Sequence, residues 1–168
     1  MVKDDIQPPL LHLICGLPGA GKTTLSQKIV AETGGIIFSP DDWIKDIWNN
    51  KAEVEGNGFR DQIEQLQWKI AKRILQNSVD VVIEWGVWEK SVREKLRDEA
   101  KSIGAKVKFY YLDINREILK ERLLKRNLSG DKHEFYIPEI EIESFLDHCF
   151  NSFQVPTEEE LITYDYIE

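Results

Sequence analysis

The chain has 168 residues, which is enough for one domain and too few for two well-buried cores. Hydrophobic residues make up 42% of it and charged residues 31%, as is usual for a globular domain. The formal net charge of −8 disfavours binding to polyanions, so we expect neither a nucleic acid nor a membrane surface as a partner.

The N-terminal residues 1–9 are expected to form a short tail before a single domain over residues 10–168. The tail begins with several charged residues and lacks the apolar core of a signal peptide. No later apolar run is long enough to cross a bilayer. Cys15 and Cys149 have neither metal-ligand nor redox-pair spacing, so both are interpreted as structural. These features favour a cytoplasmic protein.

The first element is an apolar run at residues 10–15, typical of a central parallel strand covered on both faces. A glycine-rich loop follows it and leads into a helix expected from Lys22 to Glu32. The loop reads Gly16-Leu17-Pro18-Gly19-Ala20-Gly21-Lys22-Thr23, with Thr24 after it. Such a turn between strand and helix directs backbone N–H groups at phosphate oxygens. We therefore predict that residues 16–24 bind the phosphates of ATP, with charge from Lys22 and with Mg²⁺ held by Thr23.

A second short strand is expected at residues 36–38, followed by Ser39-Pro40-Asp41-Asp42 at the start of a helix. Serine suits the N-cap, proline the first helical position, and Asp42 the acidic position three residues after the cap. Asp41 is not needed for capping and follows a strand at the edge where ligands bind in open α/β sheets. We predict that Asp41 is the general base that accepts a proton from a substrate hydroxyl.

An amphipathic helix from residue 59 to 74 precedes a third strand at residues 79–84. Glu84 ends this run, where an acid commonly holds Mg²⁺ in phosphate-loop enzymes. Of the five tryptophans, four follow one of the two candidate carboxylates, namely Trp43, Trp48, Trp85 and Trp88. Trp43 and Trp88 are candidate contacts to a ring-bearing substrate; core packing is the alternative.

The second half continues with a helix over residues 89–102, a strand over 107–112 and a helix from 114 to 127. Arg122 and Arg126 are four residues apart on that last helix, before a polar stretch. We predict a lid at about residues 127–138, through which Arg126 neutralises charge during phosphoryl transfer. Arg93 is a further substrate-binding candidate, with an ordinary surface residue as the alternative.

The chain should end with a helix over residues 138–150 and a fifth strand at 161–164. Strands that alternate with helices predict a mostly parallel sheet with helices on both faces. The sequence thus predicts a three-layer α/β fold of the P-loop NTPase type with a short lid.

With these motifs, the chain resembles the zeta-toxin and polynucleotide-kinase-like group of P-loop kinases, often grouped loosely with AAA-family ATPases. The resemblance rests on residues 16–24, Ser39 to Trp43, Ile83-Glu84 and the run from Glu121 to Asn127. It also includes Arg93, Phe153 and Pro156.

The resemblance implies that Asp41 is the general base, that Arg122 lies against the adenine, and that Arg126 reaches the phosphates. It also implies that the segment around Pro156 forms the adenine-side loop. Glu84 departs from the group, many members of which have aspartate there.

The leading hypothesis is an ATP-dependent kinase that phosphorylates a hydroxyl of a small molecule. A 5′-hydroxyl kinase for a nucleoside or polynucleotide is the alternative among enzymes. A nucleotide-dependent switch or an ATPase without an acceptor is the alternative from another class. Asn50-Lys51-Ala52-Glu53 lacks the aspartate of a guanine-recognition motif, which disfavours a GTP switch.

Overall fold

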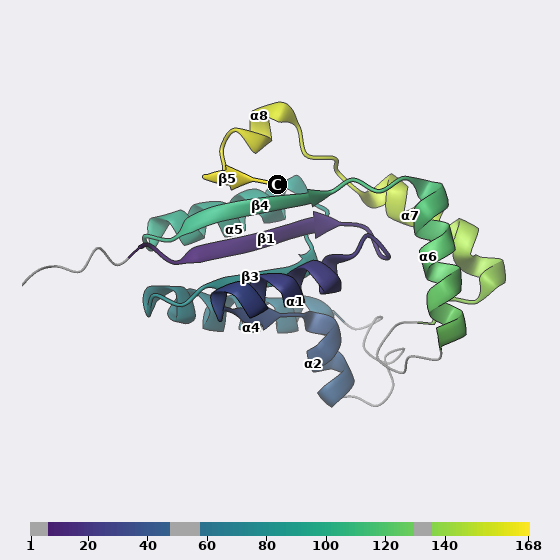
Figure 1. The fold of residues 1–168 in the computed structure, drawn as a ribbon, viewed down its shortest axis with the longest axis horizontal. Helices are drawn as coiled ribbons and strands as arrows, with labels where there is room; N and C mark the ends of the chain where they lie inside the picture. Colours follow the sequence, from purple (N-terminus) through teal and green to yellow (C-terminus); the bar gives the residue numbers. More distant parts are fainter. Residues whose placement is uncertain (1–6, 48–57, 130–135) are drawn as a thin grey trace, which may run out of the picture.

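The computed structural model describes residues 7–47, 58–129 and 136–168. Five strands form one sheet in the order β2-β3-β1-β4-β5, and every neighbouring pair is parallel (Figure 1). The strands are β1 (Leu10–Gly16), β2 (Ile36–Phe38), β3 (Val81–Gly86), β4 (Lys106–Leu112) and β5 (Tyr166–Ile167). The predicted α/β fold class with five strands is confirmed.

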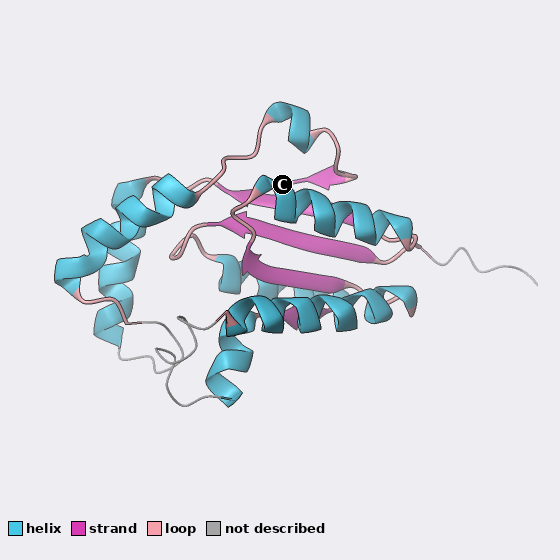
Figure 2. Cartoon of the chain, turned by 180° about the vertical axis from the view of Figure 1, so that it is seen from behind, coloured by secondary structure: helices cyan, strands magenta, loops and turns pink. Residues whose placement is uncertain are grey.

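Helices cover both faces of the sheet, as Figures 1 and 2 show from opposite sides. Helix α1 (Lys22–Thr33) lies on one face, where Ile29 packs against Ile14 of β1. Helices α4 (Phe59–Gln76) and α5 (Lys90–Ser102) lie on the other, where Leu13 of β1 belongs to the main core cluster. Successive side chains of a strand point to opposite faces, so the apolar run of β1 is buried on both.

A separate apolar cluster lies beyond the carboxyl ends of the strands. There α6 (Arg116–Ser129) and α7 (Ile142–Ser152) pack beside each other, with the short 3₁₀ helix η1 (Glu139–Glu141) leading into α7 (Figure 1). Leu119 and Leu123 of α6 and Leu146 of α7 share this cluster with Leu17 and Ala20 of the glycine-rich loop. The packing therefore attaches the α6–α7 layer to the loop that ends β1.

The third strand lies two residues later than predicted. Val79 and Asp80 precede it, and the Asp80 carboxylate accepts a hydrogen bond of 2.8 Å from the Leu10 backbone N–H. Asp80 therefore connects the starts of two strands instead of extending one. The strand continues to Gly86, so Glu84 lies inside β3, not at its end.

The predicted fifth strand at residues 161–164 is wrong in position. The short helix α8 (Glu158–Leu161) precedes it, with the Thr157 side chain accepting a hydrogen bond from the Glu160 N–H as an N-cap. The strand that pairs with β4 is Tyr166–Ile167. Tyr164 is buried instead against Phe109, with ring centroids 4.4 Å apart.

Part of the predicted lid, residues 130–135, lies outside the described residues. Its two described ends are joined, because the Asn127 side-chain amide donates to the Ile137 carbonyl at 2.5 Å. Among the helices of the described ranges, none is both long and apolar enough to cross a membrane.

Candidate active site

The glycine-rich loop connects buried β1 to α1 and adopts the backbone shape expected of a phosphate-binding loop. Gly19 and Gly21 have φ values of 82° and 102°, in the left-handed region that side chains disfavour. Gly21 is the N-cap of α1, so the first turn of that helix follows directly. Free N–H groups and the positive end of the helix dipole meet at this point, which suits an anion.

Lys22 lies across this loop. Its ammonium group donates to the Leu17 carbonyl at 3.1 Å. Burial lowers the pKa of Lys22 below its ordinary value, and the negative charges of Glu84 and Asp41 act against that shift.

Glu84 is bound by two hydroxyl groups of α1. Thr23 Oγ1 donates to one carboxylate oxygen at 2.5 Å and Ser26 Oγ to the other at 2.6 Å. The structure therefore brings together the two residues predicted to bind metal, Thr23 and Glu84. Hydroxyl and carboxylate oxygens are the donors that Mg²⁺ prefers.

Ser26 was not anticipated from the sequence, since a serine inside a helix carries no signal of its own. The described residues contain no group of three or more His, Cys, Asp or Glu side chains placed to bind a metal. Mg²⁺ at Thr23 and Glu84 would therefore complete its shell with phosphate oxygens and water, as is usual for this cation.

Asp41 is exposed in the first turn of α2 (Pro40–Ile47), just after β2. Its carboxylate accepts a hydrogen bond of 2.8 Å from the guanidinium of Arg60, which also bonds Glu64 at 3.0 Å. Burial acts to lower the pKa of Arg60, but the charges of Asp41 and Glu64 outweigh burial and raise it. Arg60 was not anticipated from the sequence. In an amphipathic helix, a charged residue that binds a specific partner looks the same in sequence as one that is exposed to solvent.

A buried glutamine holds this corner of the sheet together. The Gln67 side chain is fully buried; its amide donates to the Ser39 carbonyl at 2.9 Å and accepts from the Trp85 indole at 2.9 Å. Gln67 thus fixes the residue before α2 relative to β3. Trp43 is half-buried and packs near Phe38, with ring centroids 6.2 Å apart.

Trp88 contacts the base of the phosphate loop. Its indole N–H donates to the Gly16 carbonyl at 3.3 Å, and its ring packs against the cluster containing Leu17. The substrate roles of Trp43 and Trp88 stay predictions. Trp48 lies outside the described residues.

Helix α6 brings Arg122 to the loop, where its guanidinium donates to the carbonyls of Gly19 at 3.1 Å and Ala20 at 3.2 Å. Arg126 lies one turn further along the same helix and is half-buried. The pair is thus on the helix that packs against the phosphate loop, with Arg122 in direct contact.

Arg93 contacts one of these residues, through the Trp88 backbone carbonyl, and also binds the C-terminal segment. Its side chain is 0% exposed and forms a bidentate ion pair with Glu160, at 2.6 and 2.8 Å. The same guanidinium donates to the carbonyls of Val87 and Trp88. Its position therefore does not support the substrate contact expected of Arg93, because all this hydrogen bonding is directed into the protein.

The segment that contains Pro156 runs beside the loop after β3. The Gln154 N–H donates to the Trp88 carbonyl at 3.1 Å, and the Gln154 side chain accepts from the Lys90 N–H at 2.8 Å. Pro156 itself is buried and belongs to the segment that joins α7 to α8. Its role beside the adenine stays a prediction.

Comparison with known proteins yields one family match. The family described as "AAA domain" matches residues 11–151. No curated protein matches the chain significantly.

Several solved structures share the fold. Kti12 from Chaetomium thermophilum, in complex with ADP-AlF3, has a TM-score of 0.66 at 18% identity, over 89% of this chain and 82% of that one. A gluconokinase from Sinorhizobium meliloti 1021 has a TM-score of 0.56 at 18% identity, over 91% and 79%. The PezAT toxin-antitoxin system of Streptococcus pneumoniae contains a chain with a TM-score of 0.66 at 17% identity, over 96% and 66%. The fold is thus a kinase-like P-loop fold, and the resemblance to P-loop kinases is confirmed.

Proposed function

Because the chain belongs to the AAA-domain family, we propose that it is an ATP-dependent kinase that transfers the γ-phosphoryl group of ATP to a hydroxyl of a small molecule. The observation that carries the proposal is the contact of the phosphate loop with β3, where Thr23, the residue after Lys22, donates to the Glu84 carboxylate at 2.5 Å. A phosphate-binding lysine, a metal-binding carboxylate and a second, exposed carboxylate are the groups that phosphoryl transfer to an alcohol requires.

The nucleotide would be held by the loop N–H groups, by Lys22 and by Arg122. Mg²⁺ bound at Thr23 and Glu84 would neutralise charge on the phosphates. Arg122 already contacts the loop at Gly19 and Ala20, which supports a position beside the bound nucleotide.

Asp41 would accept the proton of the acceptor hydroxyl. As the new bond from the acceptor oxygen to phosphorus forms, the bond between phosphorus and the oxygen of ADP breaks. Arg126, one turn beyond Arg122, would neutralise charge on the transferring group. Arg60 holds the Asp41 carboxylate at 2.8 Å and would orient it toward the hydroxyl.

The nature of the neighbours supports this function, since one is a gluconokinase and another was obtained with ADP-AlF3. The net charge of −8 supports a small acceptor over a nucleic-acid chain, which would be repelled.

The test follows label from γ-labelled ATP into sugars, nucleosides, hydroxylated antibiotics and a 5′-hydroxyl oligonucleotide. Lys22→Ala is the control, because it removes the charge partner of the phosphates. We expect acceptor-dependent ADP release with a small molecule and none in the variant. Phosphate release that needs no acceptor would favour an ATPase or switch, and salt-sensitive labelling of the oligonucleotide would favour the polynucleotide kinase.

A further inference from the structure

Trp88, which follows β3, contacts the phosphate loop at its first residue. The indole N–H donates to the Gly16 carbonyl at 3.3 Å. Because a peptide unit is planar, fixing this carbonyl also fixes the direction of the Leu17 N–H on the opposite side. The Leu17 carbonyl in turn accepts a hydrogen bond of 3.1 Å from the Lys22 ammonium. Trp88 is therefore connected to Lys22 through two consecutive residues of the loop.

Gly86 leaves room for the hydrogen bond of the indole. Its φ is 85°, and a Cβ at this position would lie 2.9 Å from Trp88 Nε1 and 3.4 Å from the Gly16 carbonyl oxygen. A methyl group there would thus displace the indole from the carbonyl. Gly104 has nearly the same φ, 88°, but a Cβ there would meet no atom within 4 Å. The two glycines therefore separate the strain of a left-handed φ from the loss of the contact.

The backbone that carries Trp88 is held in an unfavourable conformation. Val87 has a φ of 39°, which is rare for a β-branched residue and persists only where the surrounding contacts impose it. The buried guanidinium of Arg93 donates to the carbonyls of Val87 at 3.1 Å and Trp88 at 2.9 Å. The Cys15 thiol also donates to the Val87 carbonyl, at 3.6 Å. These contacts restrict the direction in which the Trp88 side chain leaves the backbone.

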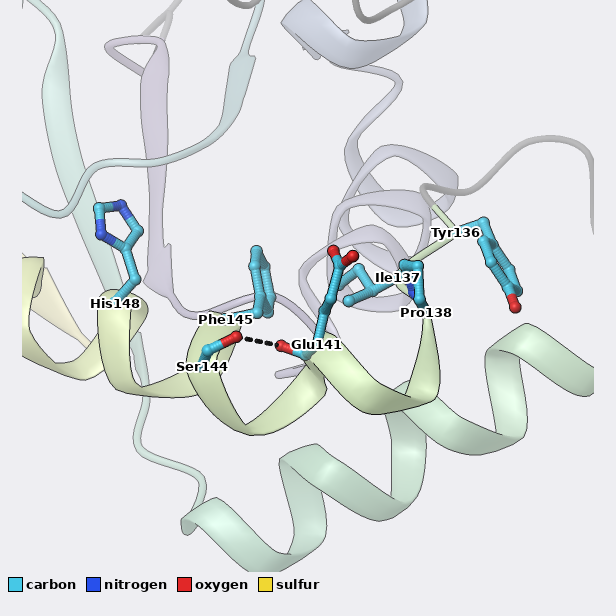
Figure 3. A pocket seen from close by; sticks show the side chains of 7 residues that line it. All are labelled: Tyr136, Ile137, Pro138, Glu141, Ser144, Phe145 and His148. Atoms are coloured by element: carbon cyan, nitrogen blue, oxygen red, sulfur yellow. Dashed lines mark hydrogen bonds between the residues drawn. The ribbon is translucent and has the colours of Figure 1, made fainter.

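The Trp88 ring packs against the apolar cluster that joins the phosphate loop to α6 and α7. Phe145 of α7 packs against the same cluster and also lines a hollow of about 290 Å³ beside η1 (Figure 3). Within the described part of the chain, the residues that line this hollow include none from the phosphate loop or β3. The hollow therefore does not include the loop, whereas Trp88 contacts the loop backbone directly.

We propose that Trp88 is a positioning residue of the phosphate loop, which acts through Gly16 and Leu17 on the binding of nucleotide phosphates rather than as a contact to the acceptor. Gly86 gives the indole access to the loop, and Arg93 holds the backbone from which the indole extends. The inference rests on the proposed function for its ligand, the phosphates of a nucleotide, and is independent of the acceptor.

The test measures the binding of MgATP and of magnesium tripolyphosphate, which has phosphates but no ring, by calorimetry on the whole chain. Trp88→Phe removes the N–H donor and keeps an aromatic ring. We expect it to weaken the binding of both ligands by a similar factor of about 3–10, as the loss of one hydrogen bond allows. If Trp88 instead contacted a ring-bearing substrate, the affinity for tripolyphosphate would be unchanged, and that result would overturn the inference.

Trp68→Phe is the matched control, because it also removes one bonded indole N–H. Trp68 is buried in the main core and donates to Glu99 at 2.9 Å, and Glu99 keeps its bond to Lys72 at 2.6 Å. This variant should leave both affinities unchanged. In the NMR spectrum of the indole N–H groups, the signal missing from Trp88→Phe should move when tripolyphosphate is added to the wild type. A shift no larger than that of the Trp68 signal would contradict the proposal.

A second pair of variants tests the same contact without changing Trp88. Gly86→Ala should weaken tripolyphosphate binding at least as much as Trp88→Phe, whereas Gly104→Ala, with the same backbone strain, should not. Equal effects of the two glycine variants would overturn the inference. Binding of tripolyphosphate that depends on Trp88, without acceptor-dependent ADP release, would support the inference and refute the kinase function, so the two failures are distinguishable.

Discussion

Two arginine–carboxylate pairs lie at opposite corners of the molecule and differ in burial. Arg60 and Asp41 join α4 to α2 with side chains 38% and 53% exposed. Arg93 and Glu160 join α5 to α8 with both side chains 0% exposed. Both distances are short, at 2.8 and 2.6 Å, so hydrogen-bond geometry does not separate them.

The difference in burial determines how readily each carboxylate can separate from its arginine. An exposed carboxylate can exchange its partner for a substrate or water at little cost, as Asp41 must if it accepts a proton. A fully buried charge loses far more when its partner leaves, because no water replaces it. Arg93 therefore holds the loop of Val87 and Trp88 to the C-terminal segment, while Arg60 lies where chemistry is proposed.

The largest expected effect is on catalysis at the exposed pair. Asp41→Asn should reduce phosphoryl transfer by about 10²–10⁴, the usual contribution of a positioned general base, while MgATP binding is retained. Single-turnover kinetics and equilibrium nucleotide binding measure the two quantities separately.

Asp42→Asn is the control for that change, since Asp42 is the next residue in the first turn of the same helix. An acid in the first helical turn interacts favourably with the helix dipole, so its loss should cost at most about 1 kcal/mol of stability and lower the rate only modestly. If Asp42→Asn abolished phosphoryl transfer while Asp41→Asn stayed active, Asp42 and not Asp41 would be the general base.

The buried pair of Arg93 and Glu160 should contribute more to the free energy of unfolding than the exposed pair. Arg93→Met should lower the free energy of unfolding by about 3–5 kcal/mol, because Glu160 would keep an uncompensated charge in the core. Chemical denaturation of the variant measures this loss. The double variant Arg93→Met, Glu160→Leu should recover much of it, and a loss as large as in the single variant would show that packing, not charge, governs this corner.

A smaller change in stability is expected at the exposed pair. Arg60→Gln should cost at most about 1 kcal/mol of unfolding free energy, since solvent screens both partners. The same denaturation experiment compares it with Arg93→Met. A cost equal to that of Arg93→Met would contradict the distinction drawn between the two corners.

The smallest effect is a dependence on pH at Lys22, whose pKa in the folded chain is lowered by burial. Between that lowered pKa and the ordinary value of 10.5, the unfolded chain binds more protons than the folded one. The stability of the nucleotide-free protein should therefore rise with pH across this window. Nucleotide phosphates favour the protonated lysine, so ATP binding should take up protons there.

Calorimetry in buffers of different ionisation enthalpy measures this uptake, with Lys22→Met as the control that lacks the group. Equal proton uptake by the wild type and the variant would exclude Lys22 as its source.

The sequence by itself determined the features that depend on neighbouring residues. The phosphate loop needs one strand, three glycines and one helix in succession, so Gly16 to Thr23 could be recognised without tertiary contacts. The parallel sheet followed from alternating apolar runs and amphipathic helices. Asp41 could be proposed because a residue just after a parallel strand lies at the binding edge.

The tertiary structure alone decided which charged side chains meet. Arg60 and Arg93 look alike in sequence, and only contacts across 19 and 67 residues separate the exposed pair from the buried one. Ser26 reaches Glu84 across 58 residues, and the position of β5 depends on its pairing with β4. The local sequence pattern indicates whether a residue suits a helix or a strand. Whether a charged side chain is buried depends on which distant parts of the chain pack against it.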